Sequence, residues 1–585
     1  MKVSSVRITL IIAIFLLVCG PRPASAQAPL EPAQMPPRTL FYLIWRGFPD
    51  PEARKSNSLL ALWDDADFAP VRSAIAAGML NSSGEKSEKP KLTREQVQEF
   101  AGLLENSFTL GYLREPARRN LLNGAVVPDA KPAAWNGMFL VYDRSGKEAL
   151  LSKAMLQLRA EEKETPQLSQ LTIGGIQVLK AEGKSGVMYW AEQGKYAVSA
   201  GERSVMEEIL GRLGKKVSGA ASLAQSAAYQ EAQANLGGGL VEFFLRIPDL
   251  KEFASDSKAG VFQVAPLLEA AKIDSVHSLS GRITFDGAKT HVQAAIVGDA
   301  SPGTPFDIWG AGLPSPASLA FVPADAVSYT SGQVNFQGIY DTVKRVARAA
   351  FPQTQQGNAD LIDTLAQQKL GMPVPDALAL LTGEFASMQT SPSMDSTKQV
   401  YFFGIRNKAE TLKLMRTVLS EQLTSERNEG EITFLKISLG GKQSGAGSAQ
   451  WNFFNLAVTQ DMIVGANRTE TLREVLANRA RNSSAGLTTV PQFQAGRTRH
   501  PGNLTGLSYV DFGKIDWPAL KDRLNENEKK SSVAKTLNSS KDAAPSAALD
   551  WLGQINPQVF SRHLHCSSSV SWQDMKGIHW DQWIE

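Results

Sequence analysis

The stretch Met-Phe-Leu-Val-Tyr-Asp-Arg-Ser-Gly at residues 138–146 leads from an apolar, strand-like run through a turn into a segment with helical periodicity. The stretch Val-Tyr-Phe-Phe-Gly-Ile-Arg-Asn-Lys at residues 400–408 repeats this plan. Arg144 then matches Arg406, and Glu148 matches Glu410 at the same offset. Repetition on this scale is typical of a duplicated domain.

The repeat extends in both directions from these stretches. Pro36 and Tyr42 have the same spacing as Pro323 and Tyr329, at the first strand of each half. Both halves also end in a candidate β-hairpin, the first one with an Asp-Gly turn at residues 286–287. The pattern predicts an α+β fold of two tandem duplicated units, each a mainly antiparallel sheet with helices packed on one face. Val141 and Phe403 are predicted to occupy equivalent places in the two sheets.

At 585 residues the chain is too long for a single hydrophobic core, because single cores stop growing near ~250–300 residues. Prolines and glycines between the halves indicate a linker, and a stretch rich in Lys, Ser, Asn and Ala indicates a polar insert. The predicted segments are a signal peptide at 1–26, a tether at 27–34, the first unit at 35–300, a linker at 301–312, and the second unit at 313–585 with a polar insert at 525–547.

The N-terminus has the layout of a secretory signal. Lys2 and Arg7 precede an apolar run at 8–18, and Ala24-Ser25-Ala26 offers the small residues that signal peptidase needs. Cleavage after Ala26 predicts a periplasmic or secreted protein with no transmembrane segment in the mature chain. A lipid anchor on Cys19 is the alternative, although Val18 stands where lipoprotein signals normally carry a small residue.

Charge and cysteine content limit the mature chain further. Removing residues 1–26 takes Lys2, Arg7 and Arg22 from the 61 basic residues and leaves 58 to balance the 58 acidic ones. A neutral chain does not favour nucleic acid as a partner. Cys566 then remains as the single cysteine, so the mature chain is expected to form no internal disulfide.

Four segments together resemble an uncharacterised family of exported bacterial proteins. They are the proline-led strands at 35–40 and 322–327, the Leu-Leu-Thr-Gly-Glu-Phe-Ala segment at 380–386, and the strand-turn-helix that ends in Ala-Asn-Arg at 466–468. The family has a domain of unknown function that begins with a Pro-Ala-Asp-Thr-like strand. The first unit departs from this pattern, since Pro37-Arg38 replaces the Ala-Asp pair. The resemblance implies export and a repeated α+β build, and it implies no catalytic residues.

One histidine group could hold a metal ion. His563 and His565 lie two residues apart, so in a strand their side chains would share one face, and His579 lies on the other arm of the terminal hairpin. Imidazole ligands suit zinc or copper. The alternative is a partly buried polar strand in which Cys566 packs as a small apolar residue.

Other candidate sites have simpler explanations. The acidic run at 64–67 suits a helix cap better than a calcium loop, because the glycine and the terminal glutamate of such a loop are missing. The glycine-rich run at 440–447 has its lysine too early for a phosphate loop. Arg497, Arg499 and His500 form a basic cluster that suits a solvated loop or an anion.

The sequence therefore favours an exported cell-envelope protein without catalytic function. Its expected partner is an envelope macromolecule or an apolar ligand, bound through the surface between the two units. No cofactor is expected. The alternative is an exported hydrolase, assisted by a zinc ion at His563, His565 and His579.

Overall fold

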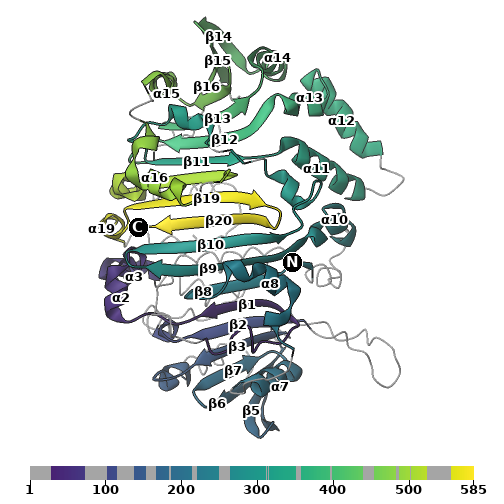
Figure 1. Ribbon diagram of the computed structural model, residues 1–585, viewed down its shortest axis with the longest axis vertical. Helices are drawn as coiled ribbons and strands as arrows, with labels where there is room; N and C mark the ends of the chain where they lie inside the picture. The colour runs from purple at the N-terminus through teal and green to yellow at the C-terminus, as the bar shows by residue number, and fades with distance from the viewer. Residues whose placement is uncertain are drawn as a thin grey trace, which may run out of the picture. The chain divides into compact units, whose positions relative to one another are not determined.

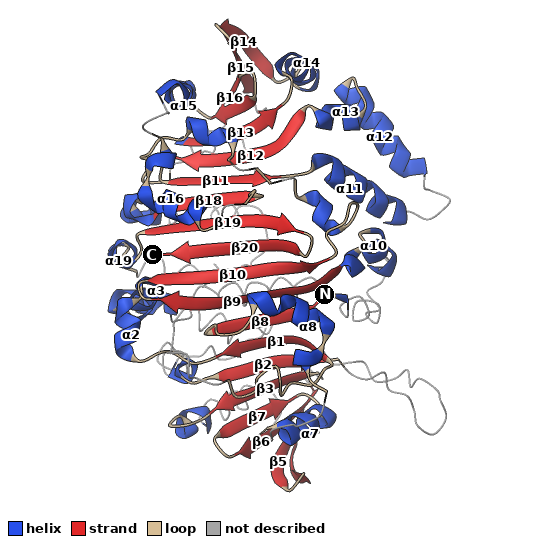
Figure 2. Ribbon diagram, viewed as in Figure 1, coloured by secondary structure: helices blue, strands red, loops and turns tan. Residues whose placement is uncertain are grey.

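The computed structural model describes residues 28–72, 102–114, 137–152, 167–183, 186–213, 221–248, 264–310, 312–313, 315–350, 357–394, 398–438, 453–481, 486–500, 502–522 and 555–585. The predicted signal peptide at 1–26 and polar insert at 525–547 lie outside these residues. The described helices and strands establish an α+β protein with extensive antiparallel pairing, as the sequence predicts (Figure 2).

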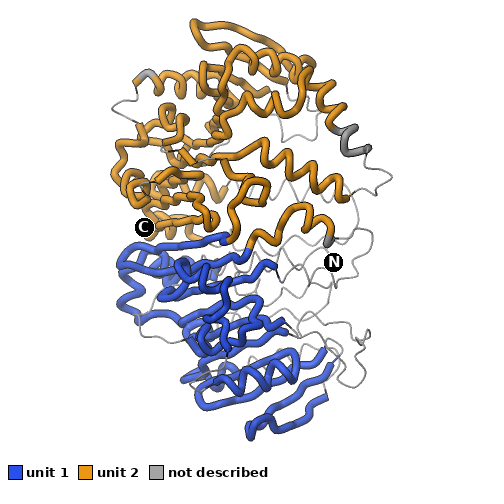
Figure 3. The backbone as a smooth tube through the Cα atoms, turned by 45° about the vertical axis from the view of Figure 1, so that its right-hand side comes forward, with its two compact units in different colours: residues 1–253, 277–297 blue, residues 254–276, 298–585 orange. Residues whose placement is uncertain are grey.

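The chain forms two compact units (Figure 3). The described part of unit 1 lies within 28–248 and 277–297, and that of unit 2 within 264–276 and 298–585. The segment predicted as a linker, 301–312, belongs to unit 2. Phe306 is 1% exposed there, and the neighbouring Asp307 accepts a hydrogen bond from Nδ2 of Asn335 at 3.0 Å. Its prolines shape a packed turn rather than a free connection.

The predicted tether at 27–34 is also packed, over the residues from Ala28 onward. Leu30 is fully buried, and its backbone N–H donates to Oγ1 of Thr109 at 3.3 Å. Glu31 pairs with Arg46, the residue that follows the first strand. The Pro- and Ala-rich composition suggested flexibility, but one buried leucine and one ion pair hold the segment on the sheet.

The sheet of unit 1 has the strand order β10-β9-β8-β1-β2-β3-β7-β6-β5-β4 (Figure 1). Neighbouring strands run antiparallel from β9 to β4. The predicted hairpin is present as β9 and β10, and Gly287 takes the positive φ of 54° that its turn requires. The strands are β1 (Thr39–Trp45), β2 (Phe108–Leu113), β3 (Met138–Asp143), β4 (Gln167–Ile173), β5 (Ile176–Gly183), β6 (Gly186–Gln193), β7 (Tyr196–Ala200), β8 (Val241–Arg246), β9 (Val276–Asp286) and β10 (Lys289–Gly298).

One face of this sheet packs against helices α7 and α8. Tyr42, Val141 and Phe244 point into that core and meet Ile209 of α7 and Tyr229 of α8. The opposite face carries an aromatic cluster in which Trp45, Phe48 and Trp63 are in ring contact. The helical segments are α2 (Pro51–Ser56), α3 (Ser58–Asp64), η1 (Ala66–Phe68), η2 (Gly102–Glu105), α7 (Arg203–Arg212), η3 (Leu223–Gln225), α8 (Ala227–Ala232) and η4 (Gln233–Asn235).

The sheet of unit 2 has the strand order β20-β19-β18-β11-β12-β13-β17-β16-β15-β14, which repeats the order of unit 1 strand for strand. All of these neighbouring pairs are antiparallel. The strands are β11 (Ser328–Gln333), β12 (Leu381–Gln389), β13 (Gln399–Ile405), β14 (Leu423–Glu429), β15 (Ile432–Ser438), β16 (Phe453–Val458), β17 (Met462–Ala466), β18 (Gly506–Asp511), β19 (Cys566–Asp574) and β20 (Gly577–Ile584).

Unit 2 has apolar cores on both faces of its sheet. Phe402 of β13 faces the core beneath α15 and α16, whereas Ile405 faces a second core with Leu412 of α14. The prediction of helices on one face is therefore wrong. The strands of unit 2 bury apolar side chains on both sides, and in unit 1 Trp63 of α3 joins the aromatic cluster on the face opposite α7 and α8. The helical segments are α10 (Val264–Ala270), η5 (Ile273–Ser275), η6 (Pro305–Ile308), η7 (Ala317–Phe321), α11 (Phe336–Ala350), α12 (Gly357–Leu370), α13 (Val374–Ala379), α14 (Lys408–Val418), α15 (Thr469–Arg481), η11 (Leu487–Thr489), α16 (Pro491–Thr498), η12 (Phe512–Lys514) and α19 (Gln558–His563).

The ladder registers correct the predicted alignment by one residue. Val141 pairs with Val198 of β7, and Phe402 pairs with Val464 of β17. All four side chains are fully buried. Phe403 is 42% exposed and faces the other side. Val141 therefore corresponds to Phe402, and the matching of Arg144 with Arg406 requires one additional residue in the turn of unit 2.

Candidate functional site

The three predicted histidine ligands do not come together. His563 ends helix α19, so the strand alternation that would place it beside His565 does not apply. The backbone N–H of His565 donates to the carbonyl of Glu585 at one end of the terminal hairpin. His579 lies opposite Trp572 in the terminal hairpin. Trp572 is six residues along β19 from Cys566, the neighbour of His565, so His579 is about 20 Å along the strand from the end that holds His565. Within the described residues, no three His, Cys, Asp or Glu side chains are grouped to hold a metal ion.

His579 instead belongs to a stack of rings. His500 stacks on Trp572 with ring centroids 4.0 Å apart, and Trp572 stacks on His579 at 5.2 Å. Burial lowers the pKa of His500, and nearby His579 lowers it further against the opposing effect of Asp581. Nε2 of His579 lies 3.2 Å from Oδ1 of Asp574, without the geometry of a hydrogen bond. This ring stack is a packing feature of the hairpin.

The residues of the other predicted sites make local structural contacts. Asp65 caps the short helix η1 by accepting from the N–H of Asp67 at 2.9 Å, which confirms capping as the role of the acidic run. Cys566 is 6% exposed, as expected for a small packed residue. Arg499 lies over the Trp583 ring at 4.4 Å. The glycine-rich run at 440–447 lies outside the described residues.

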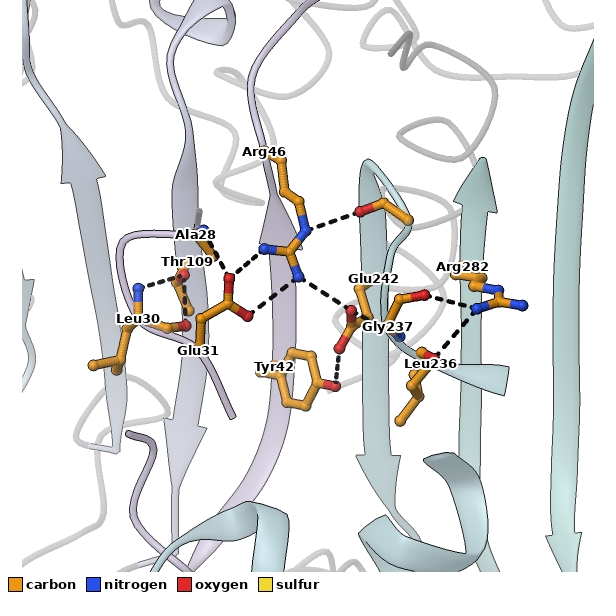
Figure 4. Close-up of polar contacts among 11 residues, drawn as sticks. Ala28, Leu30, Glu31, Tyr42, Arg46, Thr109, Leu236, Gly237, Glu242 and Arg282 are labelled. Carbon is orange, nitrogen blue, oxygen red and sulfur yellow. Dashed lines mark hydrogen bonds and ion pairs between the residues drawn. The ribbon is translucent and has the colours of Figure 1, made fainter. Parts of the chain in front are cut away.

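A buried polar network joins strands β1 and β8 of unit 1 to the 28–35 segment (Figure 4). Glu242 of β8 is 1% exposed, and it accepts from the Tyr42 hydroxyl at 2.7 Å and from the N–H of Gly237 at 3.1 Å. Arg46 reaches Glu242 at 3.4 Å, Glu31, and the carbonyl of Gly239 at 2.9 Å. Burial, followed by the charge of Glu242, raises the pKa of Tyr42 well above its ordinary value, so its proton stays on the hydroxyl and donates. The network fixes the 28–35 segment over the sheet.

Unit 2 contains a cleft of about 420 Å³, which we call the unit-2 cleft. Three chain segments form its walls: the approach to β11, the turn after β12 with the start of β13, and one face of α15. The α15 residues follow the helical spacing that places side chains on one face. The lining residues are Pro323, Asp325, Thr390, Ser391, Pro392, Lys398, Thr471, Glu474, Val475 and Asn478.

The charged groups of the cleft are two acids and one base. Nζ of Lys398 lies 3.4 Å from Glu474, and these side chains are 37% and 62% exposed, respectively. An ion pair this open to solvent holds its partners weakly. With Asp325 the cleft carries a net negative charge at neutral pH, surrounded by hydroxyl and amide side chains that can donate or accept hydrogen bonds.

The corresponding place in unit 1 holds two arginines of the chain itself. Arg38 donates from Nε and Nη2 to Glu208 of α7 at 3.0 and 2.6 Å, and from Nη1 to the carbonyl of Arg114 at 2.6 Å. Arg212 lies one turn further along α7, and its Nη2 is 3.4 Å from Glu208. Its Nη1 donates to backbone carbonyls at Gln34, Met35 and Ala221.

Backbone contacts establish which positions correspond in the two units. The N–H of Thr39 donates to the carbonyl of Pro36, and that of Ala326 donates to the carbonyl of Pro323. This places Asp325 where unit 1 has Arg38. Helices α7 and α15 share one burial pattern, in which Met206 corresponds to Leu472 and Glu208 to Glu474. By the same offset, Asn478 stands in the place of Arg212.

Part of this difference between the two units was visible in the sequence. The replacement of Ala-Asp by Pro37-Arg38 was visible as a departure of unit 1 from the pattern of unit 2. Its meaning depends on Glu208, which is 170 residues away in the chain and meets Arg38 only when α7 packs on the sheet.

No protein-family model, curated protein or solved structure matches this chain. The resemblance to a family of exported bacterial proteins therefore stays a prediction. In the described part of the chain, no helix combines the length and apolarity needed to span a membrane.

Proposed function

We propose that this chain is an exported, non-catalytic binding protein of the cell envelope whose ligand site is the unit-2 cleft. One observation carries the proposal. At corresponding positions, unit 1 has the long side chains of Arg38 and Arg212 bound to Glu208, whereas unit 2 has the shorter Asp325 and Asn478 around a cavity of about 420 Å³. A concave site with a few convergent polar groups is typical of ligand binding.

We further propose that the two units are tandem copies of one α+β unit. Their identical strand orders support this, as do matched core contacts. Tyr229 meets Phe244 edge-to-face at 5.7 Å in unit 1, and Phe493 meets Tyr509 edge-to-face at 5.8 Å in unit 2. Duplication explains how one copy could keep a filled, structural version of the site while the other became open to a ligand.

Export places this binding function in the cell envelope. The proposal rests on the charged start, the short apolar run and the Ala24-Ser25-Ala26 site of the sequence. Mass spectrometry of the native N-terminus is expected to find Gln27 as the first residue. A first residue at a lipidated Cys19 would instead indicate a membrane-anchored form, and retention of Met1 would contradict export.

The binding function is tested by comparing an open cleft with a filled one. Low-molecular-weight and peptide fractions of the cell envelope are added to the mature wild-type protein and to an Asp325→Arg variant, and thermal unfolding is recorded. We expect at least one fraction to raise the Tm of the wild-type protein and to leave the variant unchanged, because a bound ligand stabilises only the protein that binds it. Equal shifts in both proteins, or none in either, would contradict the unit-2 cleft as the ligand site.

A further inference from the structure

Unit 1 shows how this type of site holds a guanidinium group. The guanidinium of Arg38 donates to the carboxylate of Glu208 on one side and to the backbone carbonyl of Arg114 on the other. The Arg38 and Glu208 side chains are 24% and 25% exposed, so the pair is largely shielded from water. Planar donors that meet fixed acceptors in this way give strong and geometrically specific contacts.

Unit 2 has acceptors at the positions of Glu208 and Arg114, but it has no arginine at the position of Arg38. Glu474 corresponds to Glu208, and Ser391, two residues after the end of β12, corresponds by ladder register to Arg114 after β2. Both Glu474 and Ser391 line the unit-2 cleft. The Ser391 carbonyl accepts from the N–H of Met394 at 2.9 Å, and its second lone pair can accept from a further donor. Asp325 has taken the place of the Arg38 donor, so an acid stands where unit 1 has a base.

Lys398 is the basic residue that lines the cleft, and its contact with Glu474 is loose enough for a ligand cation to replace it there. Its single ammonium contact to Glu474 is long at 3.4 Å, and Glu474 is 62% exposed. A guanidinium offers five donors in a fixed fork, whereas an ammonium acts as a compact point charge. A ligand guanidinium that paired with Glu474 and Asp325 would therefore bind in preference to a ligand ammonium.

We propose that the unit-2 cleft binds the guanidinium group of an arginine side chain presented by a peptide ligand. The inference rests on the proposed function and names its ligand chemistry. The ligand's guanidinium takes the place of Arg38 in unit 1. It pairs with the carboxylate of Glu474 and donates one N–H to the carbonyl of Ser391. Asp325 supplies the second negative charge, which makes the site selective for a cation.

The test uses three acetylated and amidated tripeptides, Gly-Arg-Gly, Gly-Lys-Gly and Gly-citrulline-Gly, titrated calorimetrically into the mature full-length protein. Citrulline has nearly the shape of arginine without its charge. We expect saturable binding of the arginine peptide, with the citrulline peptide weaker by about tenfold or more, since hydrogen bonds to charged groups are the stronger ones. The lysine peptide is expected to lie between them. Higher salt is expected to weaken the arginine peptide most.

Variants assign the binding to the cleft. Glu474→Gln and Asp325→Arg are expected to lower the affinity for the arginine peptide about tenfold or more, the first by removing charge and the second by filling the space. Glu470→Gln makes the same charge change on an exposed residue of α15 outside the cleft, and is expected to bind as the wild type does. Asp325→Asn gives a milder variant if the larger change unfolds the protein, and circular dichroism checks that each variant is folded.

The outcomes separate this inference from the proposed function. Equal affinity for arginine and citrulline peptides, equal affinity for arginine and lysine peptides, or full binding by Glu474→Gln would overturn the guanidinium assignment. If no tripeptide binds while an envelope fraction still stabilises the wild type and not Asp325→Arg, the cleft is a binding site for another ligand class. If neither the tripeptides nor any fraction binds, both proposals fail.

Discussion

Replacing Glu242 with alanine is expected to destabilise unit 1 by about 3 kcal/mol, because it removes one partner of a buried ion pair. Glu242 is 1% exposed and accepts from Tyr42 and Gly237. The fully buried Tyr42 hydroxyl would lose its carboxylate acceptor, and the side chain of Arg46 would keep only Glu31 and the Gly239 carbonyl. Urea unfolding gives the magnitude, and hydrogen exchange by mass spectrometry locates the loss in β1 and β8.

A matched substitution separates charge from shape at the same position. Glu242→Gln keeps an acceptor for the Tyr42 hydroxyl and most of the side-chain volume, so we expect a smaller loss than for alanine. Glu52→Ala removes an exposed glutamate from α2 and is expected to change stability by less than about 0.5 kcal/mol. A loss below 1 kcal/mol for Glu242→Ala would show that the network does not hold the 28–35 segment in place.

Replacing Phe402 with alanine is expected to cost unit 2 about 3–5 kcal/mol, the range for truncating a phenylalanine in a packed core. Phe402 is fully buried between β12 and β17 and contacts the Phe321 ring at 5.6 Å. Because two units need not unfold in one step, the urea transition is read together with hydrogen exchange of β13.

Phe403 provides the control, since it is the next residue and the same side chain. It is 42% exposed on the opposite face, so Phe403→Ala is expected to cost only about 1–2 kcal/mol. The two variants also test the corrected alignment of Val141 with Phe402. Equal losses, or a larger loss for Phe403→Ala, would contradict the register of β13.

The sequence was most informative where structure is local. The Asp286-Gly287 turn and the alternation on either side of it predicted the β9–β10 hairpin. The shared spacing from Pro36 to Tyr42 and from Pro323 to Tyr329 predicted two first strands that both bury a tyrosine completely. Turn chemistry and period-two patterning act over a few residues, so one sequence is enough to read them.

Other features depended on packing that the sequence does not display. The 28–34 segment has the composition of a tether, yet Leu30 finds a buried place beside Thr109, 79 residues away in the chain. His563 is followed closely by a strand, but it ends a helix, so its spacing from His565 carried no geometric meaning. A one-residue difference in the turn after β13 shifted the predicted alignment, because apolar residues on both faces of β13 conceal its register.

The candidate cleft illustrates the same limit. Its lining residues run from Pro323 to Asn478, and no local motif joins them. The exchange of Arg38 for Asp325 was visible in the sequence as a departure between the repeats. Only the fold brings Arg38 onto Glu208 in unit 1 and places Asp325 and Glu474 in the lining of one cleft in unit 2.

A crystal structure of the Asp325→Arg variant tests this account most directly. We predict that the introduced guanidinium lies within hydrogen-bonding distance of Glu474 and of the Ser391 carbonyl, as Arg38 contacts Glu208 and Arg114, and that Lys398 leaves Glu474. The introduced side chain would then occupy the cleft, as Arg38 occupies the corresponding place in unit 1. An introduced side chain that points into solvent beside an open cleft would contradict the equivalence of the two sites and the binding proposal built on it.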